Sequence, residues 1–196
     1  TVMILVDGVL ISNPLSSSDD FNNFGYWRLD NSTITLTTTD LTEVTLDIVI
    51  ENWGRANGGW FYHQLKGLMD DNHVYLNDQE LTSWLIYPLE FKTSFNNELS
   101  GWNSVEDDLP NGPGLYRATL TLDEDITDTF LDMSEWDKGL VIVNGFVLGK
   151  YAFIGPQQTL YLPGPFLQPG NNEIIIFEHF QPARSVKFST DIIFNT

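Results

Sequence analysis

The chain has 196 residues, of which 42% are hydrophobic, so it can build the core of one large all-β domain or two smaller ones. A net charge of −18 makes nucleic acid a poor partner, and the chain has no run of roughly 18 apolar residues that could span a membrane. The absence of cysteine excludes disulfides and thiolate metal sites. The dispersed acidic residues predict a solvated surface that loses charge below about pH 4–5, which suits an acidic compartment.

Apolar and polar residues alternate with a period of two along most of the chain, as in 44–51, 116–123 and 186–194. This alternation is typical of antiparallel strands with one buried and one solvated face. Residues 174–177 are continuously apolar instead, which predicts a strand covered on both sides. No segment predicts a helix of three turns.

Two β-hairpins are predicted, at residues 3–11 and 140–148. Asp7-Gly8 and Asn144-Gly145 stand between their apolar strands. These dipeptides favour a two-residue turn, because both of its central positions need a positive φ. The hairpins therefore fix two places where adjacent strands pair.

Each hairpin is followed by an apolar strand that ends in a glutamate, Glu51 or Glu178. This internal repeat predicts two related β-sandwich units. We expect residues 1–84 to form the C-terminal part of a first all-β domain and residues 85–196 a complete second one, joined near Pro88. The first unit lacks the strands that should precede its hairpin. It is therefore completed by another polypeptide, or the chain is a fragment, or this unit is a smaller sandwich of different topology. Thr1 in place of Met suggests a processing site or an arbitrary cut.

Residues 134–178 resemble the last domain of family 35 β-galactosidases. The shared pattern has a Lys-Gly turn at 138–139, Val-Asn-Gly at 143–145, Gly-Pro-Gln at 155–157 and Thr-Leu-Tyr at 159–161. The N-terminal half is similar to the preceding domain of that family in the same order. It carries Val-Asp-Gly at 6–8, VIENWGRANGG at 49–59, Lys-Gly-Leu at 66–68 and Trp84 followed by Tyr-Pro-Leu at 87–89.

The resemblance implies an all-β protein of two antiparallel jelly-roll or galactose-binding-like sandwich units, the first incomplete. It also implies that both catalytic glutamates lie in a (β/α) barrel outside this chain. Glu51, Glu135, Glu173 and Glu178 stand near strand ends, but none carries a catalytic motif of the family. We therefore expect no catalytic residue here and no hydrolysis by the chain alone.

The loop after Glu51 resembles the part of the family that faces the barrel and lines the sugar pocket. Its candidate rim residues are Arg55, Asn57, Gly58 and Trp60, with Gly58 where the family has a tyrosine. Trp60 or Tyr62 could replace that ring by stacking on a sugar. Alternatively, Arg55 and Asn57 only satisfy polar groups of the loop.

The second unit offers candidate carbohydrate-binding residues: Trp136, Tyr151, Phe153 and Gln157. Aromatic rings and planar polar groups are typical of sugar sites. Lys150 replaces an arginine and Ala152 a tryptophan of the family pattern, which weakens any ligand site there. The alternative is that the three aromatic residues pack in the core or between domains.

Metal binding has little support in the sequence. Asp123, Glu124, Asp125 and Asp128 could hold a structural Ca²⁺ on loop oxygens, but their spacing matches no fixed calcium loop. The three histidines form no zinc motif, and no other cofactor is expected. Asn31-Ser32-Thr33 is an N-glycosylation sequon and favours a secretory route.

The sequence therefore predicts the non-catalytic C-terminal portion, or light chain, of a secreted or lysosomal β-galactosidase-like hydrolase. Its partners would be a catalytic barrel or heavy chain and galactoside glycans. The chemistry served would be hydrolysis of terminal β-galactosides. The alternative is a separate carbohydrate-binding or structural module without hydrolase activity.

Overall fold

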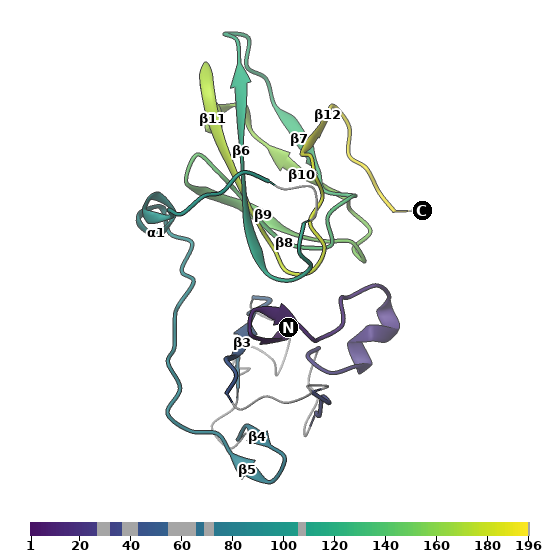
Figure 1. Ribbon diagram of the computed structural model, residues 1–196. Coiled ribbons are helices and arrows are strands. Elements are labelled where there is room, and N and C mark those ends of the chain that lie inside the picture. Colours follow the sequence, from purple (N-terminus) through teal and green to yellow (C-terminus); the bar gives the residue numbers. More distant parts are fainter. Residues whose placement is uncertain (27–31, 37–42, 55–65, 69–72, 106–108, 196) are drawn as a thin grey trace.

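The computed structural model describes residues 1–26, 32–36, 43–54, 66–68, 73–105 and 109–195, and the regular secondary structure of these residues is nearly all β (Figure 1). Among them, the only α-helix is α1 (Thr93–Glu98), and two short 3₁₀ helices are η1 (Ser18–Asn22) and η3 (Gly164–Phe166). All pairs between described strands are antiparallel. The prediction of antiparallel all-β sandwich units is confirmed.

The first unit contains a sheet in the order β2-β1-β3, formed by Val9–Leu10, Val2–Val6 and Leu46–Ile50. Asp7 (φ 50°) and Gly8 (φ 78°) make the predicted turn between β1 and β2. The Asp7 carboxylate accepts a hydrogen bond from the Thr45 N–H at 2.9 Å, which ties the turn to the start of β3. The sequence signal for this hairpin is therefore confirmed.

A small hairpin follows, formed by β4 (Tyr75–Leu76) and β5 (Gln79–Glu80). From Leu81 the chain runs without regular structure to α1, and Figure 1 shows this tract as an extended trace along one side of the molecule. This tract contains Pro88, where the sequence predicts the linker, and the boundary between the two units stays a prediction.

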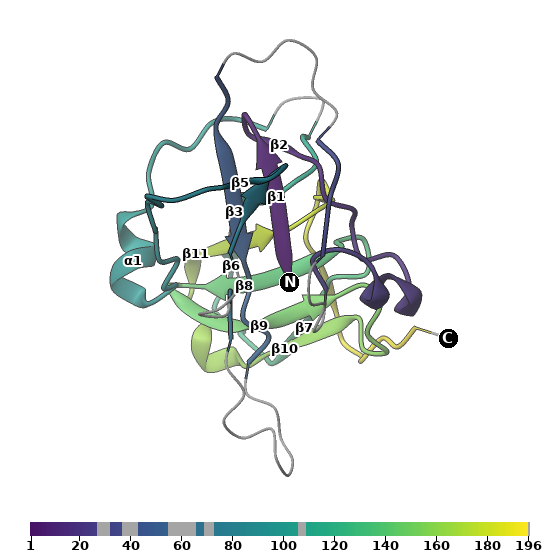
Figure 2. The same ribbon diagram turned by 90° about the horizontal axis from the view of Figure 1, so that it is seen from below.

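The second unit is a sandwich of two sheets. The first sheet has the order β6-β11-β8-β9, formed by Gly114–Leu122, Gly170–Glu178, Lys138–Val143 and Phe146–Ala152. The second has the order β10-β7-β12, formed by Thr159–Leu162, Thr129–Asp132 and Lys187–Ser189. Figure 2 shows that β1 and β3 of the first unit run across the direction of β8 and β9.

The central strands β8 and β11 have apolar contacts on both faces. Ile174 and Ile176 lie in the core between the two sheets, whereas Ile175 and Phe177 pack on the opposite side with Phe91 and Leu99. Because both faces are covered, the continuous apolar run at 174–177 needs no polar face. The expectation from that run is confirmed.

The internal repeat appears in the pairing of the strands. β1 pairs with β3 as β8 pairs with β11, in each case the first hairpin strand with the later apolar strand. When the Asp7-Gly8 and Asn144-Gly145 turns are aligned, Val2 is equivalent to Gly139. Val2 pairs with Ile50 and Gly139 pairs with Glu178, so Ile50 is equivalent to Glu178 and Glu51 to His179. The two terminal glutamates of the sequence pattern are therefore one residue out of register.

Candidate functional site

The two units meet at the equivalent ends of their paired strands, and a buried charge cluster lies there. The Lys138 ammonium forms an ion pair with the Glu51 carboxylate, and their side chains are 4% and 12% exposed. The Nδ1 atom of His179 lies 3.4 Å from the Lys138 ammonium and 3.8 Å from Glu51. Glu51 thus comes from the first unit, and its partners come from the second.

The pKa values of this cluster follow from burial and from the charge pair. Burial raises the pKa of Glu51, but the surrounding basic side chains, with Lys138 first and Lys150 also contributing, together more than reverse this and the pKa falls to about 2. Burial lowers the pKa of His179 to about 3, and the neighbouring Lys138 adds to the effect. His179 is therefore neutral at physiological pH, and its Nδ1 accepts a hydrogen bond from Lys138.

The residues after Glu51 are held by the same cluster. The Lys138 ammonium lies 4.6 Å from the centre of the Trp53 ring, in cation–π contact. The Lys150 ammonium donates a hydrogen bond to the Asn52 carbonyl and lies 3.4 Å from the Glu51 carboxylate. The second unit therefore fixes the beginning of the loop that the sequence predicted to be a substrate rim.

Glu178 organises the second-unit side of this junction. Its carboxylate is fully buried and accepts hydrogen bonds from five donors at 2.8–3.1 Å. The donors are the Tyr151 hydroxyl and the backbone N–H groups of Asp137, Lys138, His179 and Phe180. Five donors fit an ionised carboxylate, which fixes the chain on either side of the charge cluster.

Among the described acidic side chains at this junction, Asp137 has a buried oxygen atom without a hydrogen-bond partner. Its Oδ1 atom is buried and accepts no hydrogen bond from a described residue. Burial, together with the negative charge of Glu178, raises the pKa of Asp137 to about 7. The side chain is therefore protonated in mildly acidic solution.

The apolar core of the first unit also crosses the junction. Met3, Leu15 and Tyr26 form a buried cluster with Phe180, which follows β11 of the second unit. The Phe180 carbonyl accepts a hydrogen bond from the Gly112 N–H at 2.7 Å. One side of the first core is thus supplied by the second unit.

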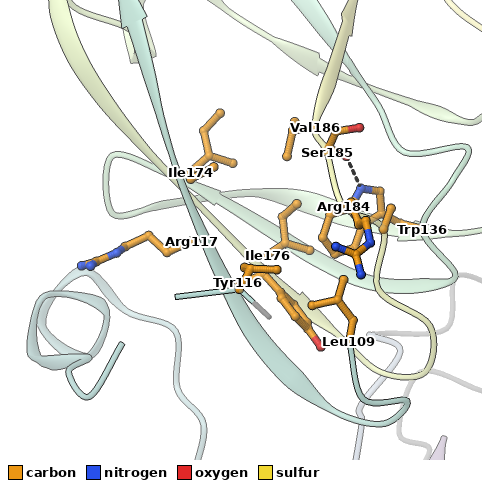
Figure 3. A pocket seen from close by; sticks show the side chains of 12 residues that line it. Leu109, Tyr116, Arg117, Trp136, Ile174, Ile176, Arg184, Ser185 and Val186 are labelled. Carbon is orange, nitrogen blue, oxygen red and sulfur yellow. Dashed lines mark hydrogen bonds between the residues drawn. The ribbon is translucent and has the colours of Figure 1, made fainter. Parts of the chain in front are cut away.

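A separate pocket opens beside β6 in the second unit (Figure 3). It holds about 140 Å³ and has mainly apolar walls, including Tyr116, Trp136, Ile174 and Val186. The Trp136 indole N–H donates a hydrogen bond to the Ser185 carbonyl at 3.1 Å, so its polar atom is already satisfied.

Two arginines reach this pocket with different orientations. The Arg117 guanidinium lies 4.6 Å from the centre of the Trp102 ring, and Figure 3 shows it pointing away from the other lining residues. Arg184 lies beside Trp136. A pocket with these walls suits a small apolar group better than a sugar, which needs several polar partners.

The structure separates the predicted carbohydrate-binding residues. Trp136 and Tyr151 are buried, 3% and 8% exposed, and both belong to the core cluster of the second unit. Phe153 is 43% exposed, and the exposed Gln157 side chain donates to the Thr159 carbonyl. The four residues thus do not present one shared aromatic platform, and Phe153 and Gln157 are the accessible members.

The remaining predicted sites are the substrate rim, the glycosylation sequon and the acidic turn. Arg55, Asn57, Gly58, Trp60 and the sequon residue Asn31 lie outside the described residues. Within the described part, no group of three or more His, Asp or Glu side chains could hold a metal ion. The Asp128 carboxylate accepts hydrogen bonds from the Tyr161 hydroxyl and the Gly164 N–H, so it is engaged within the protein.

Sequence reasoning missed the charge cluster. Lys138 follows an acidic turn and is the first residue of the buried strand β8, and this position gives no indication that its ammonium is buried. His179 directly follows the apolar run and Glu178. The available signal was the repeat itself, because equivalent strand ends are the places where two related units can meet.

Comparisons with known proteins agree with this architecture. The sequence profile described as "Beta-galactosidase, first all-beta domain" matches residues 20–90, and "Beta-galactosidase, galactose-binding domain" matches residues 113–172. This chain belongs to the C-terminal β-domain region of the β-galactosidase family. The resemblance seen in the sequence is thereby confirmed.

Curated relatives of this β-galactosidase-family chain are considerably longer. Human "Beta-galactosidase-1-like protein 2" is 41% identical over 147 residues, covering 74% of this chain and 23% of the relative. "Beta-galactosidase 1" of Dictyostelium discoideum is 38% identical over 167 residues, covering 81% and 25%. Bovine "Beta-galactosidase" is 32% identical over 195 residues, covering 88% and 30%. The chain thus spans about a quarter of the length of these relatives.

Proposed function

We propose that this chain is the non-catalytic C-terminal portion of a β-galactosidase-like hydrolase. It packs on a catalytic barrel, in the same polypeptide or as a light chain beside a heavy chain, and shapes the rim of the active site. The substrates served are terminal β-galactosides. The family match of both units supports the assignment to a β-galactosidase.

The observation that carries the rim role is the buried pair of Glu51 and Lys138. It lies at the end of β3, directly before the loop that contains Arg55, Asn57, Gly58 and Trp60. An anchored strand end limits where the following loop can lie. The second unit therefore supports substrate binding by positioning residues of the first unit, without touching substrate itself.

The natural protein tests this proposal directly. We expect native mass spectrometry to give a mass well above 22.3 kDa, because a catalytic portion accompanies the chain. We also expect the preparation to hydrolyse a chromogenic β-galactoside with retention of anomeric configuration, as a double displacement requires. Hydrolytic activity must be absent from the isolated chain.

A second candidate function is a carbohydrate-binding or structural module without hydrolase activity. The exposed ring of Phe153 and the neighbouring Gln157 favour it. A lone species of 22.3 kDa that binds galactose and hydrolyses nothing would establish this alternative. Substituting Phe153→Ala should then weaken galactose binding, because it removes the stacking surface.

The proposed location is secreted or lysosomal. The highly acidic composition and the sequon at Asn31 support it. In the part of the chain that the structure describes, no helix has the length and apolar character needed to cross a membrane. Removal of N-glycans from natural material should lower its mass, and Asn31→Gln should abolish that change.

A further inference from the structure

An exposed apolar segment, residues 84–89, connects the two units, and we call it the strap. Leu85, Ile86 and Tyr87 are 80%, 86% and 78% exposed, and the flanking Trp84 and Leu89 are 42% and 47% exposed. Soluble monomers rarely expose large contiguous apolar patches, and such patches mark interaction sites. The strap is therefore a candidate docking surface.

The backbone of the strap is also unpaired. No backbone–backbone hydrogen bond joins residues 82–91 to another described residue. Ser83 (φ 65°) and Phe91 (φ 47°), at either end of this tract, have a left-handed backbone conformation, which interrupts an extended strand. Leu85, Ile86 and Tyr87 thus offer N–H and C=O groups, as well as side chains, to a partner.

The composition of the strap contrasts with the rest of the chain. No charged residue stands between Glu80 and Glu90, although 18% of the chain is charged. The adjacent hairpin adds exposed Tyr75 (56%) and Leu76 (42%) to the apolar surface. At the foot of the strap, a hollow of about 360 Å³ has apolar walls from Val74, Leu81 and Trp84 and polar walls that include His73 and Glu80. These features extend the docking surface onto the first unit.

We propose that the strap is the surface on which the catalytic portion of the β-galactosidase-like protein docks, an inference that rests on the proposed function. About three quarters of the length of the matched relatives lies outside this chain. The strap also belongs to the region that matches the family's first all-β domain. A second copy is a poorer occupant, because two chains of charge −18 repel each other.

The test is hydroxyl-radical labelling of the intact natural protein, with two tyrosines compared in one sample. Tyr87 is 78% exposed in this chain and Tyr161, on the second unit, is 49% exposed. Exposure within the chain alone predicts faster labelling of Tyr87. If the catalytic portion covers the strap, labelling of Tyr87 is lost relative to Tyr161, and amide exchange at Leu85 and Ile86 slows.

A matched pair of variants checks that the shielding arises at the strap. Ile86→Asp places a charge in the proposed apolar contact, which should expose Tyr87 to labelling in the natural protein. Ile192→Asp is the control, because Ile192 is also exposed (48%) and belongs to the segment after β12, whose C-terminal end lies on the other side of the molecule from the strap (Figure 1). The control should leave Tyr87 shielded. Neither side chain belongs to a buried core cluster, so neither change removes a core residue.

Native mass spectrometry of the same sample distinguishes failure of the docking proposal from failure of the proposed function. If the catalytic portion is present but Tyr87 still labels faster than Tyr161, the proposed docking surface is wrong and the proposed function stands. A lone chain of 22.3 kDa overturns both. A shielded Tyr87 in an assembly of two copies of this chain overturns the proposed occupant.

Discussion

Lys138 is a buried cation, and its charge is neutralised by the Glu51 carboxylate of the other unit. Its side chain is 4% exposed, and burial lowers its pKa while Glu51 raises it. The net free energy of such a pair is small, because desolvation opposes the attraction. Removing one partner is costly, however, because the other remains buried and unpaired.

We expect Lys138→Met to destabilise the chain by about 3–5 kcal/mol, because Glu51 loses its partner. The double variant Lys138→Met with Glu51→Leu should recover part of this loss. Urea denaturation measures both changes. Lys187→Met is the control, since its ion pair with Glu135 is exposed and should contribute little. Equal effects of the buried and exposed lysine variants would contradict this account of the junction.

Folding shifts the pKa values of Asp137 and His179 in opposite directions. The pKa of Asp137 is about 7 in the folded state instead of 3.8, so between these pH values the folded state keeps a proton that the unfolded state has lost. Acidification from pH 7 to 4 therefore stabilises the folded state. The pKa of His179 is about 3 instead of 6.5, so acidification from pH 6.5 to 3 destabilises. The two effects oppose each other between pH 6.5 and 4.

Each single variant should therefore reveal the effect of the other residue. Asp137→Asn should lose stability on acidification from pH 6.5 to 4 more steeply than the unmodified chain. His179→Gln should gain stability over the same range. Burial raises the pKa of Glu178, so protonation of Glu178 adds to this gain on acidification. Urea unfolding at a series of pH values measures the slopes. Parallel curves for all three proteins would show that neither group is perturbed as described.

At the scale of elements, the close pairing of β8 with β11 depends on a glycine. Gly139 faces Glu178 in this pair, and a Cβ atom at Gly139 would overlap the Phe177 carbonyl oxygen. It would also lie 2.7 Å from the Tyr151 hydroxyl oxygen. Both neighbours belong to the arrangement around the buried carboxylate, so neither can move freely.

We expect Gly139→Ala to destabilise the chain by about 1–3 kcal/mol through overpacking. Gly149→Ala in β9 is the matched control, because its Cβ would meet only the flexible Leu160 side chain at 3.3 Å. Thermal unfolding compares the two. If Gly149→Ala cost as much stability as Gly139→Ala, the loss would reflect alanine in a strand and not the contact with Phe177.

At the scale of the whole molecule, the two units do not have independent cores. Phe180 belongs to the second unit by sequence, yet it packs with Met3, Leu15 and Tyr26. The charge cluster crosses the same junction. The first unit should therefore fold stably only against the second.

Phe180→Ala should destabilise the first unit by about 3–5 kcal/mol, since it leaves a cavity in that core. In hydrogen exchange, protection of β1 and β3 should fall while protection of β8 and β11 is largely kept. Leu162→Ala, in the core of the second unit, is the comparison and should lower protection in both units. Uniform loss of protection in Phe180→Ala would show that the whole chain unfolds as one unit.

Local patterns were enough to predict much of the fold. Asp7-Gly8 and Asn144-Gly145 specified their turns, because few dipeptides tolerate two successive positive φ values. The apolar run at 174–177 predicted a strand covered on both faces. The division at residues 84 and 85 stays a prediction, and so do the rim residues and the sugar-binding residues.

The sequence by itself determined the strands, the two hairpins, the repeat and the family, because each depends on neighbouring residues or on residues in a fixed order. Only the tertiary structure decided that Glu51 pairs with Lys138, that Phe180 completes the first core and that Trp136 and Tyr151 are buried. These contacts join residues 27 to more than 150 positions apart, such as Tyr151 with Glu178, and Phe180 with Met3. Periodicity shows that a side chain faces inward, but it does not show which distant side chain it will meet there.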